Sequence, residues 1–432
     1  MRFDKEKNIL KLFLFLFWIP LFFWIANLYK EKPLYGAYVP RNKPVFVDSL
    51  WFSGKYQEMA EGYINDSIAF RNFFVRFRNQ VDYTFFNKTH AIDNFVGKEG
   101  NLVAESHLDF YYGKTGQWPT SLEELGFKLK KLQDTMEREG KTLLIAIAPN
   151  KGFTYPEMAP FWYQKRQAQS VNDYEAFVKN CRKNRVKTID FQNWFYGLKQ
   201  NVSEPLYPWG GVHWTQFLAT QALDSLVKHV GFLRSEKLPS LIRTGVEVVD
   251  TPRYSDNDME KLLNLLTGAR KDKYQYQKFR IDTTGKKKID LALISDSYGF
   301  SWFFENQVQQ VFNKWSNWYY FKRVDSNQPS HGKSVSQVSL QEQIKLHDVF
   351  VILSTGTNLS EIGWGFIQKA YDLYFDPRMK KVNEWMEKIR NDKSFFEQIE
   401  RKAREANIDV EAQLYFDAYY QAEEEEKRAK SQ

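Results

Sequence analysis

The clearest pattern in the sequence is a set of short apolar runs separated by amphipathic stretches. Residues 142–149, 291–295 and 348–355 are nearly continuous apolar runs, as is typical of strands buried on both faces of a parallel sheet. Residues 122–139 and 217–230 carry apolar positions at helical spacing. This alternation predicts an α/β fold with a doubly wound, mostly parallel sheet flanked by helices.

The rest of the pattern predicts what surrounds this core. Residues 47–86 have the spacing of two helices, and residues 94–103 have the turn residues and apolar flanks of a β-hairpin. Residues 231–288 are charged and irregular, which fits an insertion or lid and fits an ordinary surface loop equally well. The predicted segments are a cytoplasmic stub with a transmembrane anchor (1–29), a linker (30–46), an α/β domain (47–375) and a C-terminal helical extension (376–432).

Residues 12–28 form the only strongly apolar segment of the chain. Four basic residues precede this segment, as on the cytoplasmic side of an exported helix; they are Arg2, Lys5, Lys7 and Lys11. The segment is slightly short for a full span, and its length also fits the core of a cleaved signal peptide. However, residues 24–29 lack a small-x-small cleavage site, and Trp18 and Trp24 suit a membrane interface. We therefore predict an uncleaved, single-pass anchor with the main domain outside the cytoplasm.

Composition narrows the possible functions. The chain has 432 residues, and its 61 Lys and Arg against 53 Asp and Glu are spread along it rather than gathered into a basic arm, so nucleic-acid binding is not indicated. Cys181 is the only cysteine, which excludes an intramolecular disulfide and a cysteine-based metal site. No metal-binding or nucleotide-binding motif is present, and no cofactor is predicted. Aromatic residues make up 17% of the chain, which suits stacking on sugar rings but equally suits a large core.

Ser297 is the candidate nucleophile. It follows the apolar run 291–295 in a Ser-Asp-Ser sequence, where a buried strand would end in a tight turn that opens a helix. A serine at such a turn projects its hydroxyl from the strand end, and free amides of the next helical turn can hold a negative oxygen. The alternative is that Asp296 or Ser297 only caps the following helix.

A serine nucleophile needs a base, and His213 is the best candidate among the six histidines. Gly210 and Gly211 precede it and allow a close approach of the backbone. Trp214 follows it and is suited either to fix the imidazole or to stack on a ligand. The alternative is a histidine that is held in a turn by backbone groups. The other histidines lie in helix-like or loop contexts without a supporting pattern.

Several short motifs, taken in order, resemble those of a known family. They are Val96-Gly97-Lys98-Glu99-Gly100-Asn101-Leu102, residues 146–149 with Tyr155-Pro156, Gly211-Val212-His213-Trp214, Ser295-Asp296-Ser297 and Thr357-Asn358-Leu359. Over residues 60–375 the chain resembles the SGNH-hydrolase-like acetyltransferases typified by the alginate O-acetylation proteins.

The resemblance implies an SGNH-like fold and an acyl-serine mechanism outside the cytoplasm. Ser297 matches the family's nucleophile, His213 matches its base, and Asp296 is the acidic residue beside the nucleophile. Gly356 and Asn358 would lie near the oxyanion or the substrate.

The resemblance also implies partners and a location. The acetyl group would come from a membrane-bound O-acyltransferase and would pass to a cell-surface or exported polysaccharide. The expected location is the bacterial inner membrane, with the main domain in the periplasm. A carbohydrate esterase of the same fold would use the same residues, and would differ in whether water reaches the acyl-enzyme.

One position departs from the family pattern. An Asp two residues before the histidine orients it in the family, and here that position is Gly211. Loss of the orienting acid lowers triad activity by orders of magnitude, although residual serine–histidine catalysis can persist. Asp190, Glu204 or a backbone carbonyl are possible substitutes. Without a substitute, the chain would be a catalytically weak enzyme or a non-catalytic glycan-binding or assembly component.

Overall fold

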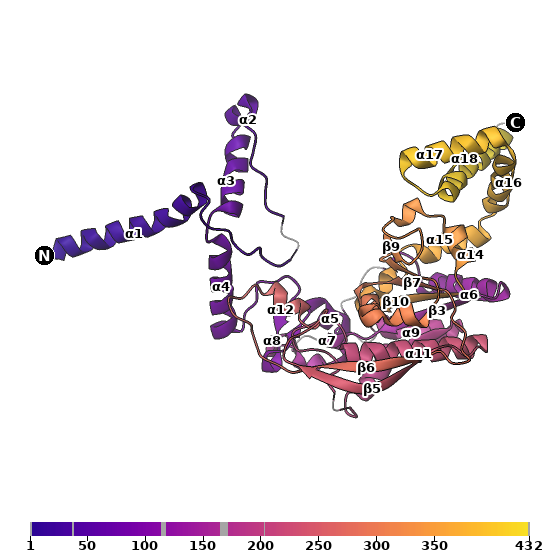
Figure 1. The fold of residues 1–432 in the computed structure, drawn as a ribbon, viewed down its shortest axis with the longest axis horizontal. Coiled ribbons are helices and arrows are strands. Elements are labelled where there is room, and N and C mark those ends of the chain that lie inside the picture. The colour runs from indigo at the N-terminus through magenta and orange to yellow at the C-terminus, as the bar shows by residue number, and fades with distance from the viewer. Residues whose placement is uncertain (1, 37–38, 114–117, 165–171, 203, 431–432) are drawn as a thin grey trace. The chain divides into compact units, whose positions relative to one another are not determined.

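The structure is a computed structural model that describes residues 2–36, 39–113, 118–164, 172–202 and 204–430 (Figure 1). The first residue of the predicted anchor, two residues of the predicted linker and the last two of the predicted C-terminal extension lie outside this part. The chain forms two compact units. One consists of residues 1–102, 209–211 and 257–272, and the other of the remaining residues. The division does not follow the predicted boundary at residue 47, because the helices after that position cluster with the amino-terminal unit.

The larger unit is built on a six-stranded sheet with the strand order β4-β3-β10-β7-β8-β9. Its strands are β3 (Thr142–Ala148), β4 (Thr188–Asp190), β7 (Leu291–Ser295), β8 (Trp315–Tyr319), β9 (Arg323–Ser326) and β10 (Val349–Thr355). Neighbouring strands run parallel except for the antiparallel pair β8 and β9. The predicted α/β fold with a mostly parallel sheet is therefore confirmed.

Alternate residues of the central strands enter two hydrophobic cores, one on each face of the sheet. On one face Leu144 and Leu293 pack in a cluster with helices α10 (Phe191–Leu198) and α11 (Gln216–Arg234). On the other face Ile145 and Ile294 pack in a cluster with the helices α6 (Leu122–Arg138), α9 (Asp173–Lys183) and α15 (Phe366–Phe375). Both faces of β3, β7 and β10 are buried, which explains why these runs contain so few polar residues.

The apolar pattern does not reveal β8, because two of its buried positions are polar. The Ser295 hydroxyl of β7 donates to Asn317 Oδ1 over 2.9 Å, and Ser316 Oγ lies 3.1 Å from His347 Nε2. These side chains satisfy one another inside the sheet, so they can be buried without forming an apolar run.

The prediction that residues 231–288 are irregular is wrong for much of this segment. Strands β5 (Ser240–Val249) and β6 (Tyr274–Asp282) form an antiparallel pair, in register from Ser240 opposite Asp282 to Val249 opposite Tyr274. The pair packs beside α11, where the Arg243 guanidinium lies 4.8 Å from the centre of the Phe217 ring. Charged residues occupy many exposed positions of these strands, and they obscured the alternation expected of a strand.

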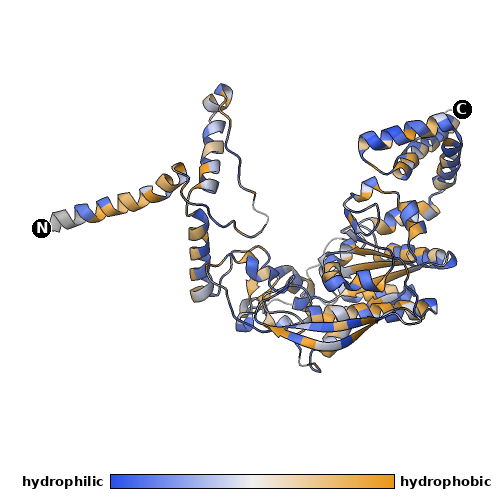
Figure 2. Cartoon of the chain, viewed as in Figure 1, coloured by the Kyte–Doolittle hydropathy of each residue, from blue (hydrophilic) through white to orange (hydrophobic). Residues whose placement is uncertain are grey.

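The amino-terminal unit contains the predicted hairpin, and the segment 47–86, predicted to form two helices, forms three. Its elements are α1 (Arg2–Ile25), α2 (Asp48–Phe52), α3 (Lys55–Ser67), α4 (Arg71–Phe86), α12 (Asp258–Leu262), β1 (Phe95–Val96) and the start of β2 (Leu102–Val103). Within the described residues one helix, Lys7–Ile25, is long and apolar enough to cross a membrane, with a mean hydropathy of 2.0 and no buried residues. Figure 2 shows this apolar character along α1. A signal sequence has the same properties, so the helix fits either an anchor or a signal.

The predicted C-terminal helical extension contains, within the described residues, the helices α16 (Arg378–Asn391), α17 (Lys393–Ala406) and α18 (Val410–Lys430). Their apolar faces form a separate cluster that includes Val382, Ile399 and Leu414. The extension is attached to the α/β body through Gln337, whose side-chain amide donates to the Asn407 carbonyl over 2.6 Å.

Short elements complete the larger unit. They are α5 (Glu105–Tyr111), α7 (Lys151–Thr154), α8 (Phe161–Gln164), α13 (Gln307–Val311), α14 (Leu340–Leu346) and the 3₁₀ segments η2 (Pro156–Met158), η3 (Ser297–Trp302), η4 (Phe304–Asn306), η5 (Val335–Gln337) and η6 (Gly356–Glu361). Segments η3 and η6 follow β7 and β10 directly, and they carry the site described below.

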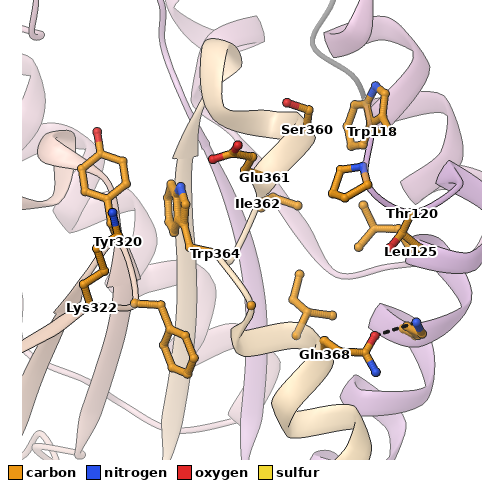
Figure 3. Close-up of a pocket in the computed structure, with 15 residues that line it drawn as sticks. Trp118, Thr120, Leu125, Tyr320, Lys322, Ser360, Glu361, Ile362, Trp364 and Gln368 are labelled. Atoms are coloured by element: carbon orange, nitrogen blue, oxygen red, sulfur yellow. Dashed lines mark hydrogen bonds between the residues drawn. The ribbon is translucent and has the colours of Figure 1, made fainter. Parts of the chain in front are cut away.

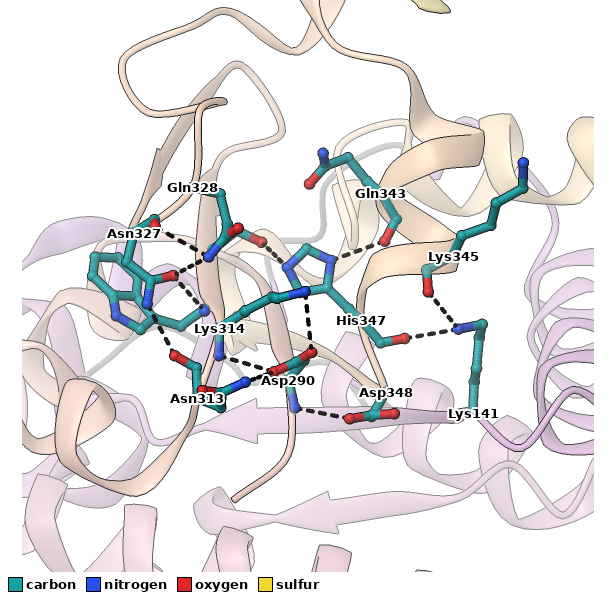
Figure 4. Close-up of polar contacts among 12 residues, drawn as sticks. Lys141, Asp290, Asn313, Lys314, Asn327, Gln328, Gln343, Lys345, His347 and Asp348 are labelled. Carbon is teal, nitrogen blue, oxygen red and sulfur yellow. Dashed lines mark hydrogen bonds and ion pairs between the residues drawn. The ribbon is translucent and has the colours of Figure 1, made fainter. Parts of the chain in front are cut away.

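A polar network joins the amino ends of the central strands (Figure 4). The Asp290 amide, just before β7, donates to the Asp348 carboxylate over 3.0 Å, and Asp290 Oδ1 accepts from the Lys314 amide over 2.9 Å. The Lys141 ammonium donates to the carbonyl of His347 over 2.9 Å. These contacts connect the loops that precede β3, β7, β8 and β10. They therefore help to fix how these strands align, and so which residues meet at the opposite edge of the sheet.

Candidate active site

The carboxyl ends of two neighbouring strands bring most of the predicted site residues together. β10 pairs with β7 from Val349 opposite Leu291 to Leu353 opposite Ser295, so the two strands end side by side. The Ser295-Asp296-Ser297 turn therefore lies next to Thr355 and the segment that follows it. This edge is where ligands bind in open α/β sheets.

Asp296 connects the two strand ends. Its side chain is buried, and its Oδ1 accepts from the Tyr298 amide over 3.0 Å. Its Oδ2 accepts from the Thr355 amide over 2.7 Å, from the Thr355 hydroxyl over 2.8 Å and from Asn358 Nδ2 over 3.0 Å. Asp296 thus caps η3, as the alternative interpretation expected, and also fixes this segment to η6. Because its carboxylate accepts four hydrogen bonds, Asp296 stabilises the geometry of the site and does not orient a histidine.

The structure places Ser297 Oγ 2.9 Å from His213 Nε2, which is hydrogen-bonding distance. Both side chains are partly exposed, whereas Asp296 beneath them is buried. A hydroxyl in contact with an imidazole nitrogen can lose its proton to that nitrogen as it attacks a carbonyl.

Three contacts fix the loop that carries His213. The Tyr298 hydroxyl donates to the Val212 carbonyl over 2.7 Å, and the Tyr298 ring lies 4.7 Å from the His213 ring. The Trp214 indole donates to Ser301 Oγ over 2.6 Å, and the Ser301 hydroxyl donates to the Tyr298 carbonyl over 2.7 Å. The segment that carries the serine therefore also positions the histidine.

Gly299 allows η3 to fold closely against the end of β7. A Cβ at this position would lie 2.2 Å from Ser295 Oγ and 2.6 Å from Ser295 Cβ. Ser295 is fully buried, and its hydroxyl is held by the hydrogen bond to Asn317. A larger residue at position 299 would therefore displace the turn that presents Ser297.

The structure adds Tyr320, which the sequence did not suggest. Tyr320 follows β8, and its amide donates to the Ser295 carbonyl over 2.8 Å. Its hydroxyl interacts with the side chains of Ser297 and Asn358. Burial and the nearby Asp296 carboxylate raise the pKa of Tyr320 to about 12, so the phenol is neutral and can donate a hydrogen bond at neutral pH. Because β8 was not predicted, nothing in the sequence pattern pointed to this residue.

The remaining predicted residues lie nearby in different settings. Asn358 contacts Asp296 and Tyr320 and so belongs to the site. Gly356 is buried, with Phe110 so close that an added Cβ would lie 2.3 Å from its ring. Trp214 is 1% exposed, so it fixes the histidine loop and does not present a face on which a substrate could stack.

The two acids considered as substitutes for the missing Asp at position 211 have other partners. Asp190 Oδ2 accepts from the Tyr174 hydroxyl over 2.8 Å, and its Oδ1 accepts from the amide of Asn193 as the cap of α10. Glu204 forms an ion pair with Arg243, with 3.6 Å between the charged atoms. Both oxygens of Asp190 are thus occupied, which leaves it poorly suited to orient His213.

The mostly parallel sheet with a serine and a histidine in contact at its carboxyl edge defines an SGNH-hydrolase-like α/β domain. Residues 118–313 match the family model for the SGNH hydrolase-like domain of the acetyltransferase AlgX. Over this segment the chain is therefore similar to that acetyltransferase family. The matched segment contains both His213 and Ser297.

The chain is also similar to three solved structures. The O-acetyltransferase domain of Pseudomonas putida AlgJ is 18% identical, with 65% of this chain and 98% of that chain covered and a TM-score of 0.40. Pseudomonas aeruginosa AlgX is 16% identical, with coverages of 68% and 69% and a TM-score of 0.39. Bacillus cereus PatB1 with a sulfonyl adduct is 11% identical, with coverages of 59% and 96% and a TM-score of 0.37. No curated protein matches the chain.

Proposed function

We propose that this chain is a membrane-anchored O-acetyltransferase that transfers an acetyl group to a hydroxyl of a cell-surface or exported polysaccharide. The single observation that carries the proposal is the contact of 2.9 Å between Ser297 Oγ and His213 Nε2 in an AlgX-type domain. Helix α1 anchors the chain in the bacterial inner membrane, the main domain lies in the periplasm, and a membrane-bound O-acyltransferase supplies the acetyl group.

The reaction proceeds through an acyl-serine. Ser297 Oγ attacks the acetyl carbonyl while His213 Nε2 takes the hydroxyl proton, and the proton then passes to the leaving group. A sugar hydroxyl next attacks the acetyl-Ser297 ester and gives its proton to His213. The O-acetylated sugar leaves, and the serine hydroxyl is restored.

A side-chain donor, rather than the nearest amides, stabilises the tetrahedral oxyanion. The amides of Tyr298 and Gly299 already bond to Asp296, through its carboxylate and its carbonyl. Asn358 Nδ2 is also committed, since it donates to Asp296 and to the Thr355 hydroxyl. The Tyr320 hydroxyl lies beside Ser297 and is the donor that we assign to this role. Such a preorganised donor is worth about 10²–10³-fold in rate.

Gly211 is the observation that favours a non-catalytic role. An orienting acid fixes the tautomer and the angle of the imidazole, and glycine has no side chain for this purpose. However, the angle of His213 is also set by Tyr298 and by the fixed backbone of the loop. We therefore assign catalysis to the site.

The test is acylation of the full-length chain in detergent micelles by a chromogenic acetyl ester, with mass spectrometry of the Ser297 peptide. We expect an acetyl adduct that is absent from Ser297→Ala and formed about 10²–10⁴-fold more slowly by His213→Ala. Ser336→Ala and His331→Ala are matched controls on the exposed surface and should acylate normally. If folded wild-type protein forms no adduct with any acetyl donor, including its native membrane fraction, the non-catalytic role is correct. Release of acetate to water at the same rate with and without a glycan acceptor would identify an esterase.

A further inference from the structure

A cavity of about 720 Å³ is lined in part by Tyr320, whose hydroxyl interacts with Ser297 (Figure 3). Its walls include Trp118, Tyr320, Ser360, Glu361 and Trp364. The volume is in the range of pockets that enclose small ligands. The acyl-serine reaction does not require a cavity of this size, so the cavity must have another role.

Aromatic rings enclose this cavity from two sides. The Trp364 and Tyr320 rings meet edge to face at 5.0 Å on one side, and Trp118 lies on the other. The Trp118 ring is held in place, since its indole donates to Asp173 Oδ1 over 3.0 Å and the ring stacks on Phe177 at 6.1 Å. Fixed aromatic faces that remain partly exposed suit the C–H faces of sugar rings.

Two of these aromatic residues have an unfavourable backbone conformation. Tyr320 and Trp364 both have a φ of 47°, in the left-handed region that large side chains rarely adopt. Trp364 stands between Gly363 and Gly365, which also have positive φ. Residues held in this way are found mainly at ligand-binding and catalytic sites, because a conformation with such a cost is kept where it places a side chain for function.

The charged side chains that line the cavity determine whether a neutral or an acidic sugar fits it better. Figure 3 shows the Glu361 carboxylate among the rings, and within the described part of the chain it has no ion-pair partner. Lys128 also lines the cavity, but its ammonium already contacts Glu124 and donates to Gln368 over 2.7 Å. Lys322 also lines the cavity, and both it and Glu361 are exposed, but Figure 3 shows the Glu361 carboxylate between the Trp364 and Trp118 rings and Lys322 beside Tyr320. A carboxylate accepts hydrogen bonds from sugar hydroxyls and repels the carboxylate of a uronic acid.

The cavity is connected to the nucleophile by shared elements. Segment η6 carries Asn358 toward Ser297 and carries Ser360 and Glu361 into the cavity wall. Tyr320 lines the cavity with its ring and interacts with Ser297 through its hydroxyl. A sugar unit bound there would lie close to an acetyl group on Ser297.

We propose that this cavity is a binding subsite for an uncharged hexopyranose unit of the acceptor polysaccharide, with Trp364 and Trp118 as its stacking surfaces. The proposal rests on the proposed function for its role in acetyl transfer. The binding of sugar itself does not depend on catalysis.

The test is calorimetric titration of full-length Ser297→Ala protein in detergent micelles with tetrasaccharides. The neutral probes are cellotetraose, mannotetraose and chitotetraose, and the charged probe is tetramannuronate. We expect at least one neutral probe to bind, with tetramannuronate at least tenfold weaker. Adding Trp364→Ala should weaken binding of the neutral probe at least tenfold, whereas Trp364→Phe should retain most of the binding. Glu361→Gln should reduce the difference in affinity between the neutral probe and tetramannuronate. Equal melting temperatures of these variants establish that they are folded.

The proposal is overturned if no neutral probe binds, if tetramannuronate binds more tightly than every neutral probe, or if folded Trp364→Ala and Trp118→Ala bind as well as the parent. Its failure can be told apart from failure of the proposed function. Loss of the Ser297 adduct in the ester assay, together with intact Trp364-dependent sugar binding, would refute the transferase and keep the subsite. A normal adduct with sugar binding that does not depend on Trp364 would refute the subsite alone.

Discussion

Substitution of Asp296 by Asn tests how the site is held together. The carboxylate accepts one donor on Oδ1, from Tyr298, and three donors on Oδ2, two of which come from Thr355. An Asn side chain has one acceptor oxygen. If it faces Thr355, its NH₂ group points at the Tyr298 amide, and two donors oppose each other inside the protein.

The magnitude follows from this mismatch. A hydrogen bond to a charged group contributes about 1.5–3 kcal/mol, and a buried unpaired donor costs about 1–3 kcal/mol. Removal of a buried charge offsets part of this loss. We therefore expect Asp296→Asn to lower the free energy of unfolding by about 2–4 kcal/mol, which is about 3–6 °C in melting temperature for a domain of this size.

The assay is thermal unfolding of the full-length chain, followed by near-ultraviolet circular dichroism, with acylation of Ser297 measured in parallel. Asp250→Asn is the matched control, because this carboxylate is 77% exposed and its ion pair with Lys273 contributes little. The reasoning is refuted if Asp296→Asn melts within 1 °C of wild type and forms the Ser297 adduct at the wild-type rate.

Three further changes test the packing around the site. Gly299→Ala should slow acylation by about 10²-fold, since the new Cβ meets Ser295 and shifts the nucleophile, while a wild-type rate would show that the turn can adjust. Ser301→Ala should cost about 1–3 kcal/mol in chemical denaturation by leaving the Trp214 indole unpaired, and unchanged stability would contradict this. Burial lowers the pKa of His347 in the folded chain, so the unfolded chain binds the extra proton first and stability should fall as the pH drops below about 6.5. His347→Gln should flatten this pH dependence of the melting temperature, and an unchanged slope would assign it to other groups.

The parts of the fold that were predictable are those in which the buried positions are apolar except at the strand ends. The runs 142–149, 291–295 and 348–355 appear in the structure as β3, β7 and β10, and they bury both faces. A strand with polar buried residues gives no such pattern. β8 was missed because Ser316 and Asn317 are satisfied by residues distant in sequence, and such pairing is visible only in three dimensions.

The same distinction applies to the candidate site. Ser297 and His213 could be proposed from local sequence, since each follows or precedes a predictable element with a characteristic turn. Tyr320 could not, because it lies after an unpredicted strand and reaches Ser297 only through the pairing of β7 with β8. The contact of Asp296 with Thr355 likewise depends on the register between β7 and β10, which fixes which residues meet at the edge.

The contacts around His213 change how the glycine at position 211 should be interpreted. In a serine–histidine–acid site, the acid both holds the imidazole at its angle and stabilises its positive charge in the transition state. Here the first task is shared by Tyr298, which bonds to Val212 and packs on the imidazole, and by Trp214, which is fixed through Ser301. None of these groups supplies a negative charge to His213. These contacts therefore supply the positioning that the acid provides in such a site, and they hold the serine and the histidine together for transfer.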